Sequence, residues 1–175
     1  MIAVLVRWLA GLRVRIAVLV VGGLLLAAFG FYGLLYWLFD RVLWKAAYLA
    51  RLHGVPDLNG KYLVTVLSSH EGHATTHNGS ASIVQSWSHL VVRIEFEESS
   101  SRSTGGWLSS APGAGVILVY AYANTPRGAA PPDLNQHDGT ASVIFDASRC
   151  ASGSYYTGRG RTTYGEVTFE PESPT

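Results

Sequence analysis

The feature that most constrains this sequence is an uncharged apolar run near its N-terminus, residues 16–39, which reads IAVLVVGGLLLAAFGFYGLLYWLF. As an α-helix it would be about 36 Å long, and the hydrocarbon core of a bilayer is about 30 Å thick. Arg13 and Arg15 precede the run, Arg41 follows it, and aromatic side chains gather at its C-terminal end, as in an interfacial belt. The run therefore predicts a transmembrane segment within residues 1–40.

A signal peptide and a buried core helix both fit the apolar run less well than a membrane span. A cleaved signal peptide has a shorter apolar core and ends in small residues, whereas this run ends in aromatic ones. A buried core helix would need further long helices to cover it, and none is predicted. The low charged fraction of the chain, 14%, and its positive mean hydropathy agree with a membrane segment, which lowers the first value and raises the second.

The sequence leaves the number of membrane spans open. Three basic residues lie on each side of the run: Arg7, Arg13 and Arg15 before it, and Arg41, Lys45 and Arg51 after it. The positive-inside rule therefore selects no orientation for a single span, although the length of the run favours one. A helical hairpin that turns near Gly22-Gly23 or Gly30 would instead place both basic clusters on the same side.

The following segment, residues 41–55, mixes apolar positions with arginine and lysine. This pattern predicts a short amphipathic helix near the membrane surface. Gly54 is expected to end the helix, and Pro56 prevents its continuation. The next domain is therefore expected to begin at Pro56.

After Pro56 the helical periodicity disappears, and short runs rich in β-branched and aromatic residues alternate with clusters of Gly, Pro, Asn and Asp. Eight strands are predicted, over residues 60–68, 79–87, 88–97, 103–110, 115–123, 139–146, 150–157 and 161–170. The connection over residues 124–138 contains three prolines and is expected to be a loop. Residues 171–175 are expected to form a disordered tail.

Eight short strands joined mostly by tight turns favour a small, lipocalin-like, up-and-down antiparallel β-barrel over residues 56–170. A β-sandwich is the alternative, but its Greek-key crossing would have to use the proline-rich loop. The interior of an eight-stranded barrel is filled by side chains or holds one small ligand. The predicted fold class is thus membrane-anchored all-β, in which a transmembrane helix or helical hairpin precedes the barrel.

Charge and cysteine content exclude some classes of function. With 13 basic and 12 acidic residues the formal net charge is +1, which argues against a partner such as long nucleic acid but not against a small anionic ligand. The single cysteine, Cys150, cannot form an internal disulfide, so the barrel is not a disulfide-stapled secreted domain. A reducing compartment is the expected setting.

Motifs for catalysis or metal binding are weak. The run HEGHATTH, residues 70–77, has zinc-like histidine spacing, but it lies on a predicted loop, where sequence proximity does not bring ligands together as it does on a helix. Glu95 and Glu97 share a strand face, which is more typical of a solvated surface than of a hydrolase. No G-x-S-x-G, P-loop or G-x-G-x-x-G motif is present. We therefore predict no enzyme, no metal site and no cofactor.

Aromatic and arginine residues alternate in a way that suits a planar anionic ligand. Aromatic faces stack nucleobases, guanidinium groups pair with phosphates, and serine hydroxyls donate hydrogen bonds. The alternative is that the tyrosines pack the barrel and the arginines decorate hairpin tips. The predicted ligand-binding residues are Trp87, Ser101, Arg102, Ser103, Tyr120, Tyr122, Tyr155, Tyr156, Thr157, Arg159 and Arg161.

Six stretches, in this order, carry a resemblance to a known family: PDLNGKY (56–62), IVQSWSHLVVRI (83–94), SSSRSTGGWL (99–108), LVYAYANTP (118–126), HDGTASV (137–143) and GSYYTGRGRTTYGEVTF (153–169). The sequence resembles the membrane-anchored β-barrel effectors of bacterial CBASS anti-phage defence, the CD-NTase-associated effectors of the S-2TMβ type. The most specific parts of the resemblance are the Q-S-W strand and the YYTGRGR hairpin.

The resemblance implies that a phage-activated CD-NTase makes a cyclic dinucleotide, that the barrel binds it, and that the anchored protein then oligomerises and disrupts the inner membrane. It implies a barrel in the cytoplasm and two membrane helices, which favours the hairpin over the single span. The remaining alternatives are a membrane-anchored periplasmic carrier of a small apolar ligand and a metalloenzyme built on the histidine loop.

Overall fold

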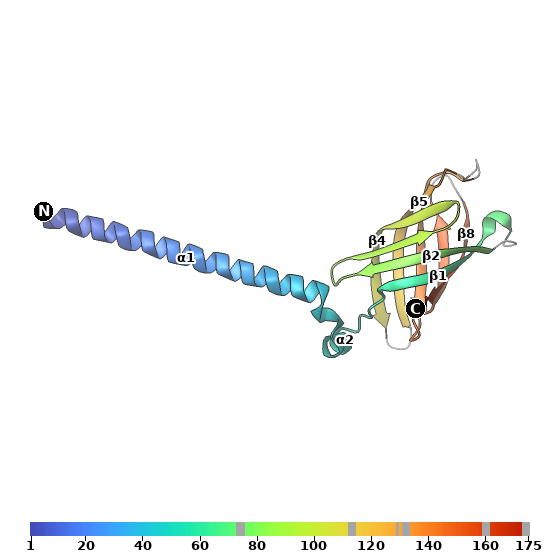
Figure 1. The fold of residues 1–175 in the computed structure, drawn as a ribbon, viewed down its shortest axis with the longest axis horizontal. Coiled ribbons are helices and arrows are strands. Elements are labelled where there is room, and N and C mark those ends of the chain that lie inside the picture. The colour runs from blue at the N-terminus through green and yellow to red at the C-terminus, as the bar shows by residue number, and fades with distance from the viewer. Residues whose placement is uncertain (73–75, 112–114, 129, 131–133, 159–161, 173–175) are drawn as a thin grey trace. The chain divides into compact units, whose positions relative to one another are not determined.

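The computed structural model describes residues 1–72, 76–111, 115–128, 130, 134–158 and 162–172. The chain divides into two compact units, residues 1–43 and 44–175 (Figure 1). The first unit is helical, and the second contains a closed β-barrel together with the short segment that precedes it.

The first unit is one continuous helix, α1, which runs from Ile2 to Arg41 and is about 60 Å long at 1.5 Å per residue. Its part Gly11–Arg41 is long and apolar enough to cross a membrane, and the large apolar side chains along it are exposed. The expected turn near Gly22-Gly23 or Gly30 does not occur, so the preference for a hairpin is wrong. The physical reason is that a glycine inside a helix costs only about 1 kcal/mol relative to alanine and does not end the helix by itself.

The segment predicted as one amphipathic helix is divided in the structure. A 3₁₀ turn, η1 (Leu43–Lys45), is followed by the short helix α2 (Ala47–His53), and Ala46 between them has an extended backbone. Gly54 ends α2 in the left-handed conformation, as predicted. Trp44 is completely buried, so this segment packs into the barrel unit instead of forming an independent helix.

Eight antiparallel strands form a closed barrel in which each strand pairs with its sequence neighbours and β1 pairs with β8 (Figure 1). The strands are β1 (Gly60–Ser68), β2 (Thr76–Gln85), β3 (Leu90–Glu95), β4 (Ser99–Ala111), β5 (Gly115–Pro126), β6 (His137–Phe145), β7 (Ala151–Thr157) and β8 (Tyr164–Pro171). This confirms the up-and-down barrel and excludes the sandwich. The largest difference from the predicted bounds is at β4, which begins four residues earlier because its serine-rich start pairs with β3 and β5.

One end of the barrel is filled by large apolar side chains. Tyr62, Phe145 and Phe169 are almost fully buried there, with ring centroids 6.0 to 6.2 Å apart. Leu58, just before β1, is also buried and accepts a 2.8 Å hydrogen bond from the Tyr62 hydroxyl at its carbonyl. This end is the one at which β1 begins and β8 ends, and we call it the closed end.

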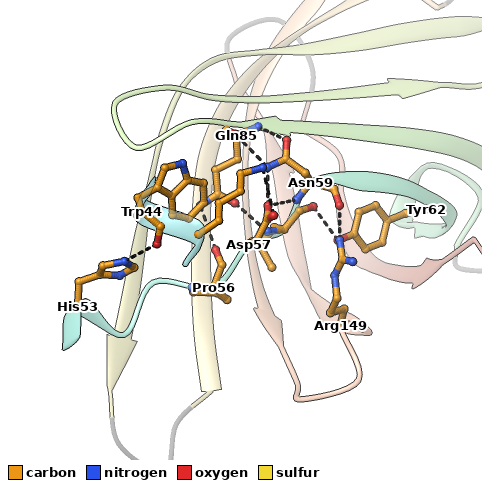
Figure 2. A network of polar contacts seen from close by, with 10 residues as sticks. Trp44, His53, Pro56, Asp57, Asn59, Tyr62, Gln85 and Arg149 are labelled. Carbon is orange, nitrogen blue, oxygen red and sulfur yellow. Dashed lines mark hydrogen bonds and ion pairs between the residues drawn. The ribbon is translucent and has the colours of Figure 1, made fainter. Parts of the chain in front are cut away.

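A polar network ties the segment before β1 to the closed end (Figure 2). The side-chain oxygen of Gln85 accepts from the Leu58 amide at 2.8 Å, and its side-chain nitrogen donates to the Pro56 carbonyl at 3.1 Å. Asn59 bonds both the amide and the carbonyl of Gln85, at 2.7 and 2.9 Å. The chain entering the barrel is therefore held by the side chain and the backbone of Gln85, the last residue of β2.

An ion pair adds to this network, because Lys45 Nζ lies 3.1 Å from Asp57 Oδ2. Partial burial alone would raise the pKa of Asp57, but hydrogen bonds from Asn59 and the nearby Lys45 ammonium outweigh it, and the pKa lies below its ordinary value. The carboxylate is thus held ionised beside Lys45.

Candidate ligand-binding site

The opposite end of the barrel opens into a cavity of about 750 Å³. The connections β1–β2, β3–β4, β5–β6 and β7–β8 all lie at this end, which we call the open end. The described lining comprises Val66, Ser68, His70, Thr76, His77, Asn78, Ile94, Phe96, Glu97, Glu98, Ser99, Ser101, Tyr120, Tyr122, Asn124, Leu134, His137, Ala141, Tyr155, Thr157, Thr163 and Val167. Pockets that hold small molecules are usually about 300–1,000 Å³ and combine apolar walls with a few polar groups, which describes this cavity.

Three tyrosines form much of the aromatic wall. Tyr120 and Tyr122 point inward from β5, with ring centroids 6.2 Å apart, and Tyr155 points inward from β7. Burial raises the pKa of Tyr120, so its phenol stays neutral and acts as a hydrogen-bond donor at physiological pH. The wall thus offers flat aromatic surfaces and hydroxyls without a fixed charge.

Glycines opposite two of these tyrosines keep the cavity open. Gly139 pairs with Tyr122 across β5 and β6, and a Cβ atom on Gly139 would lie 2.3 Å from the Tyr122 hydroxyl oxygen. Gly165 pairs with Tyr155 across β7 and β8, and a Cβ atom there would lie 2.9 Å from the Tyr155 ring. Because the glycines have no side chain, the tyrosines can lie along the barrel wall.

A buried polar cluster, Ser99–Ser101–Asn124, lies near the rim of the same cavity. Asn124 pairs directly with Ser101 across β5 and β4. Its side-chain nitrogen donates to the Ser101 hydroxyl at 2.9 Å and to the Ser99 hydroxyl at 3.2 Å. All three side chains are at most 7% exposed, so the cluster belongs to the inner wall.

The base of the β7–β8 connection is held by a pair of threonines. The Thr157 amide donates to the Thr163 carbonyl at 2.8 Å, and the Thr163 amide donates to the Thr157 hydroxyl at 2.9 Å. Gly158 donates to the Asp138 carbonyl, and Tyr164 donates to the Ser69 hydroxyl at 3.0 Å. Both threonines line the cavity, so this connection starts and ends at the rim.

Among the described lining residues, the acidic and imidazole side chains are two glutamates and three histidines. His70, His77 and His137 line the cavity, as do Glu97 and Glu98, whereas none of the described lining residues is lysine or arginine. His73 of the histidine loop lies outside the described residues. In the part of the chain that the structure describes, no three His, Cys, Asp or Glu side chains are arranged to hold a metal ion.

The structure brings five of the eleven predicted site residues together around the cavity: Ser101, Tyr120, Tyr122, Tyr155 and Thr157. Arg159 and Arg161 lie outside the described residues, in the β7–β8 connection. The other four predicted residues are Trp87, Arg102, Ser103 and Tyr156, and none of them is among the described lining residues.

These four residues have other surroundings. Trp87 lies at the closed end, with its ring 4.9 Å from His53 and 6.5 Å from Trp44. Arg102 and Tyr156 are exposed on the outer face of the barrel, while the Ser103 hydroxyl accepts a 2.9 Å hydrogen bond from the Val92 amide.

Ser99, Asn124 and His137 line the cavity although they were not among the predicted ligand-binding residues. Asn124 and His137 were assigned to the proline-rich loop, but β5 and β6 extend far enough to include them and to pair them with each other. A signal was available in the alternation Tyr120, Tyr122, Asn124, since residues two apart share a strand face.

Comparison with known proteins agrees with this architecture. A family model described as "Cap15, cyclic dinucleotide receptor domain" matches residues 53–171, which span the whole barrel. The protein CD-NTase-associated protein 15 of Yersinia aleksiciae is 36% identical over 146 residues, covering 83% of this chain and 69% of that protein. The resemblance seen in the sequence is thereby confirmed, and the chain belongs to the Cap15 family of CBASS effectors, whose barrel is a cyclic-dinucleotide-sensing domain.

Proposed function

We propose that the open-end cavity is the site at which this protein binds a cyclic dinucleotide, and that binding makes the anchored chain oligomerise and disrupt the bacterial inner membrane. The observation that carries the proposal is the cavity itself, about 750 Å³ with tyrosine walls and a polar rim. Two bases need flat apolar surfaces, while the sugar and phosphate groups need hydrogen-bond donors. The polar lining is a poor match for a carrier of an apolar ligand.

The phosphates need a source of positive charge. Among the described lining residues only histidines could supply one, and glutamates lie beside them at the rim. The β7–β8 connection leaves and rejoins the rim at Thr157 and Thr163, and its sequence contains Arg159 and Arg161. We therefore assign phosphate binding to these two arginines, whose guanidinium groups suit bidentate contacts.

The membrane part of the proposal is supported by α1. Its Gly11–Arg41 part can span a bilayer by length and composition. Because CD-NTases act inside the cell, the barrel is placed in the cytoplasm and α1 in the inner membrane. The role is that of a receptor and effector, with no catalytic step assigned to any residue.

The experiment is a calorimetric titration of the full chain in detergent micelles with a panel of cyclic dinucleotides. We expect at least one member to bind, and the double variant Arg159→Ala/Arg161→Ala to weaken that binding about tenfold or more, as expected when charge-assisted hydrogen bonds are lost. Lys61→Ala serves as the control, since its side chain is exposed at the start of β1, at the closed end. If no member of the panel gives heat or a thermal shift, the proposal is wrong.

A further inference from the structure

The Ser99–Ser101–Asn124 cluster contains an unsatisfied atom. Asn124 Oδ1 is buried and has no hydrogen-bond partner, while Asn124 Nδ2 donates to both serine hydroxyl oxygens. Buried acceptors without a partner destabilise a fold, so they are rare in native proteins. Because the cluster lines the cavity, the missing partner can come from a ligand.

The free hydrogen-bond donors and acceptors of the cluster determine which kind of ligand group it can bind. Each serine hydroxyl accepts from Asn124, and its own O–H remains available as a donor. In this amide orientation the cluster therefore presents one acceptor, Asn124 Oδ1, beside hydroxyl groups that can donate. A phosphate oxygen only accepts hydrogen bonds and would face the Asn124 oxygen unfavourably. A nucleobase edge carries donors and acceptors side by side, so it matches the cluster.

The position of Tyr122 supports this assignment. Tyr122 precedes Asn124 by two residues on β5, and both side chains point inward. Residues two apart on a strand are separated by about 6.6 Å, comparable to the extent of a nucleobase. A base stacked on the Tyr122 ring would thus present its edge to Asn124.

We infer that Ser99, Ser101 and Asn124 read the edge of one base of the ligand and so determine which cyclic dinucleotide is accepted. This inference rests on the proposed function, and it names the specificity-determining part of the same site. The arginines assigned to the phosphates bind a feature that all cyclic dinucleotides share, whereas this cluster distinguishes between them.

The test is titration of the full-length protein in micelles with cyclic dinucleotides that share one ring linkage and differ in a single base. For Asn124→Ala we expect affinity for the preferred ligand to fall about tenfold or more, while affinity for the least preferred ligand changes little. The ratio of the affinities for the preferred and the least preferred ligand should therefore fall by the same factor. The matched control is Thr125→Ala, the exposed neighbour on the same strand.

A second readout separates ligand reading from a structural role. Asn124→Ala removes the unsatisfied acceptor but also two buried hydrogen bonds to the serine hydroxyls, so the melting temperature of the ligand-free protein should fall by no more than a few degrees, and a variant that no longer folds would count against the inference. A uniform loss of affinity across the panel would show that the cluster binds the sugar-phosphate ring that all members share. That result would contradict the inference of base recognition but not the proposed function. If the wild-type chain binds no member, the proposed function fails together with this inference.

Discussion

At the scale of single residues, the closed end depends on Arg149 and Tyr62 (Figure 2). Arg149 is not glycine yet has φ of 66°, a left-handed conformation that side chains disfavour. Its guanidinium donates to the Asn59 carbonyl and, at 2.8 Å, to the Tyr62 hydroxyl, which in turn donates to the Leu58 carbonyl. Burial raises the pKa of Tyr62, although Arg149 opposes the shift, so the phenol remains protonated. One hydroxyl thus bonds both a half-buried guanidinium group and a buried carbonyl.

Tyr62→Phe is therefore expected to destabilise the barrel. The change leaves the Leu58 carbonyl without its donor and Arg149 without one acceptor, which corresponds to a loss of about 1–3 kcal/mol. Chemical denaturation of the full chain in micelles measures the effect. Tyr156→Phe, at an outward side chain that is 59% exposed, is the control and should stay within about 0.5 kcal/mol of wild type. Equal stability of the two variants would refute the role of the Tyr62 hydroxyl.

At the scale of strands, glycines control how closely two paired strands of the barrel can approach each other. Gly165 lies where β8 pairs with β1, opposite Ser68, and a Cβ atom on it would lie 1.9 Å from the Leu67 carbonyl oxygen. The β1–β8 pairing joins the two ends of the sheet, so a side chain here would push apart the strands whose pairing makes the sheet a barrel. Gly105 on β4, in contrast, has open space, because a Cβ atom on it would meet nothing within 4 Å.

Gly165→Ala should consequently lower the free energy of unfolding by about 1–3 kcal/mol or more, because backbone atoms cannot move aside as a flexible side chain can. Gly105→Ala is the matched control and should be neutral or slightly stabilising, since alanine restricts the unfolded chain. Denaturant titration compares the two variants. The clash would be disproved if Gly165→Ala unfolded at the same denaturant concentration as Gly105→Ala.

At the scale of the whole molecule, the open-end cavity belongs to the barrel unit and the apolar helix to the other unit. Association of barrels through ligand binding would raise the local concentration of α1 helices, which is the simplest way to couple the two units. Helix α1 carries small residues that allow close packing in a membrane: Gly22, Gly23, Ala27, Ala28, Gly30 and Gly33. A Cβ atom on any of the glycines would meet nothing within 4 Å, so space is available for a partner helix.

Addition of the cyclic dinucleotide that binds in the titration is therefore expected to raise the oligomeric mass of the detergent-solubilised full chain. Light scattering coupled to size-exclusion chromatography measures that mass. The Arg159→Ala/Arg161→Ala variant should keep its ligand-free mass at the same ligand concentration, because it binds more weakly. An unchanged mass for the ligand-saturated wild-type protein would show that oligomerisation is not the activating step.

Much of the fold follows from local sequence, as particular elements show. The predicted strand over residues 60–68 coincides with β1, and all eight strands were predicted with small errors at their ends. Gly54 was predicted to end a helix and does so. The hairpin expected from the family resemblance was wrong, since isolated glycines did not interrupt α1. Five of the residues predicted to bind the ligand line the cavity, and their contact with a ligand stays a prediction.

The apolar helix, the eight strands and the closure of the barrel follow from the sequence alone, because they depend on hydrophobic length and on alternation within short segments. Which side chains face the cavity, and at which end of the barrel, depends on how the strands pair in the folded protein. A bulge between Ser103 and Gly105 reverses the alternation along β4 and turns Trp107 outward. Trp87 proved to lie at the closed end, whereas Ser99 and Asn124, 25 residues apart, meet in the cavity wall. Cross-strand register sets these positions, and no single strand contains that information.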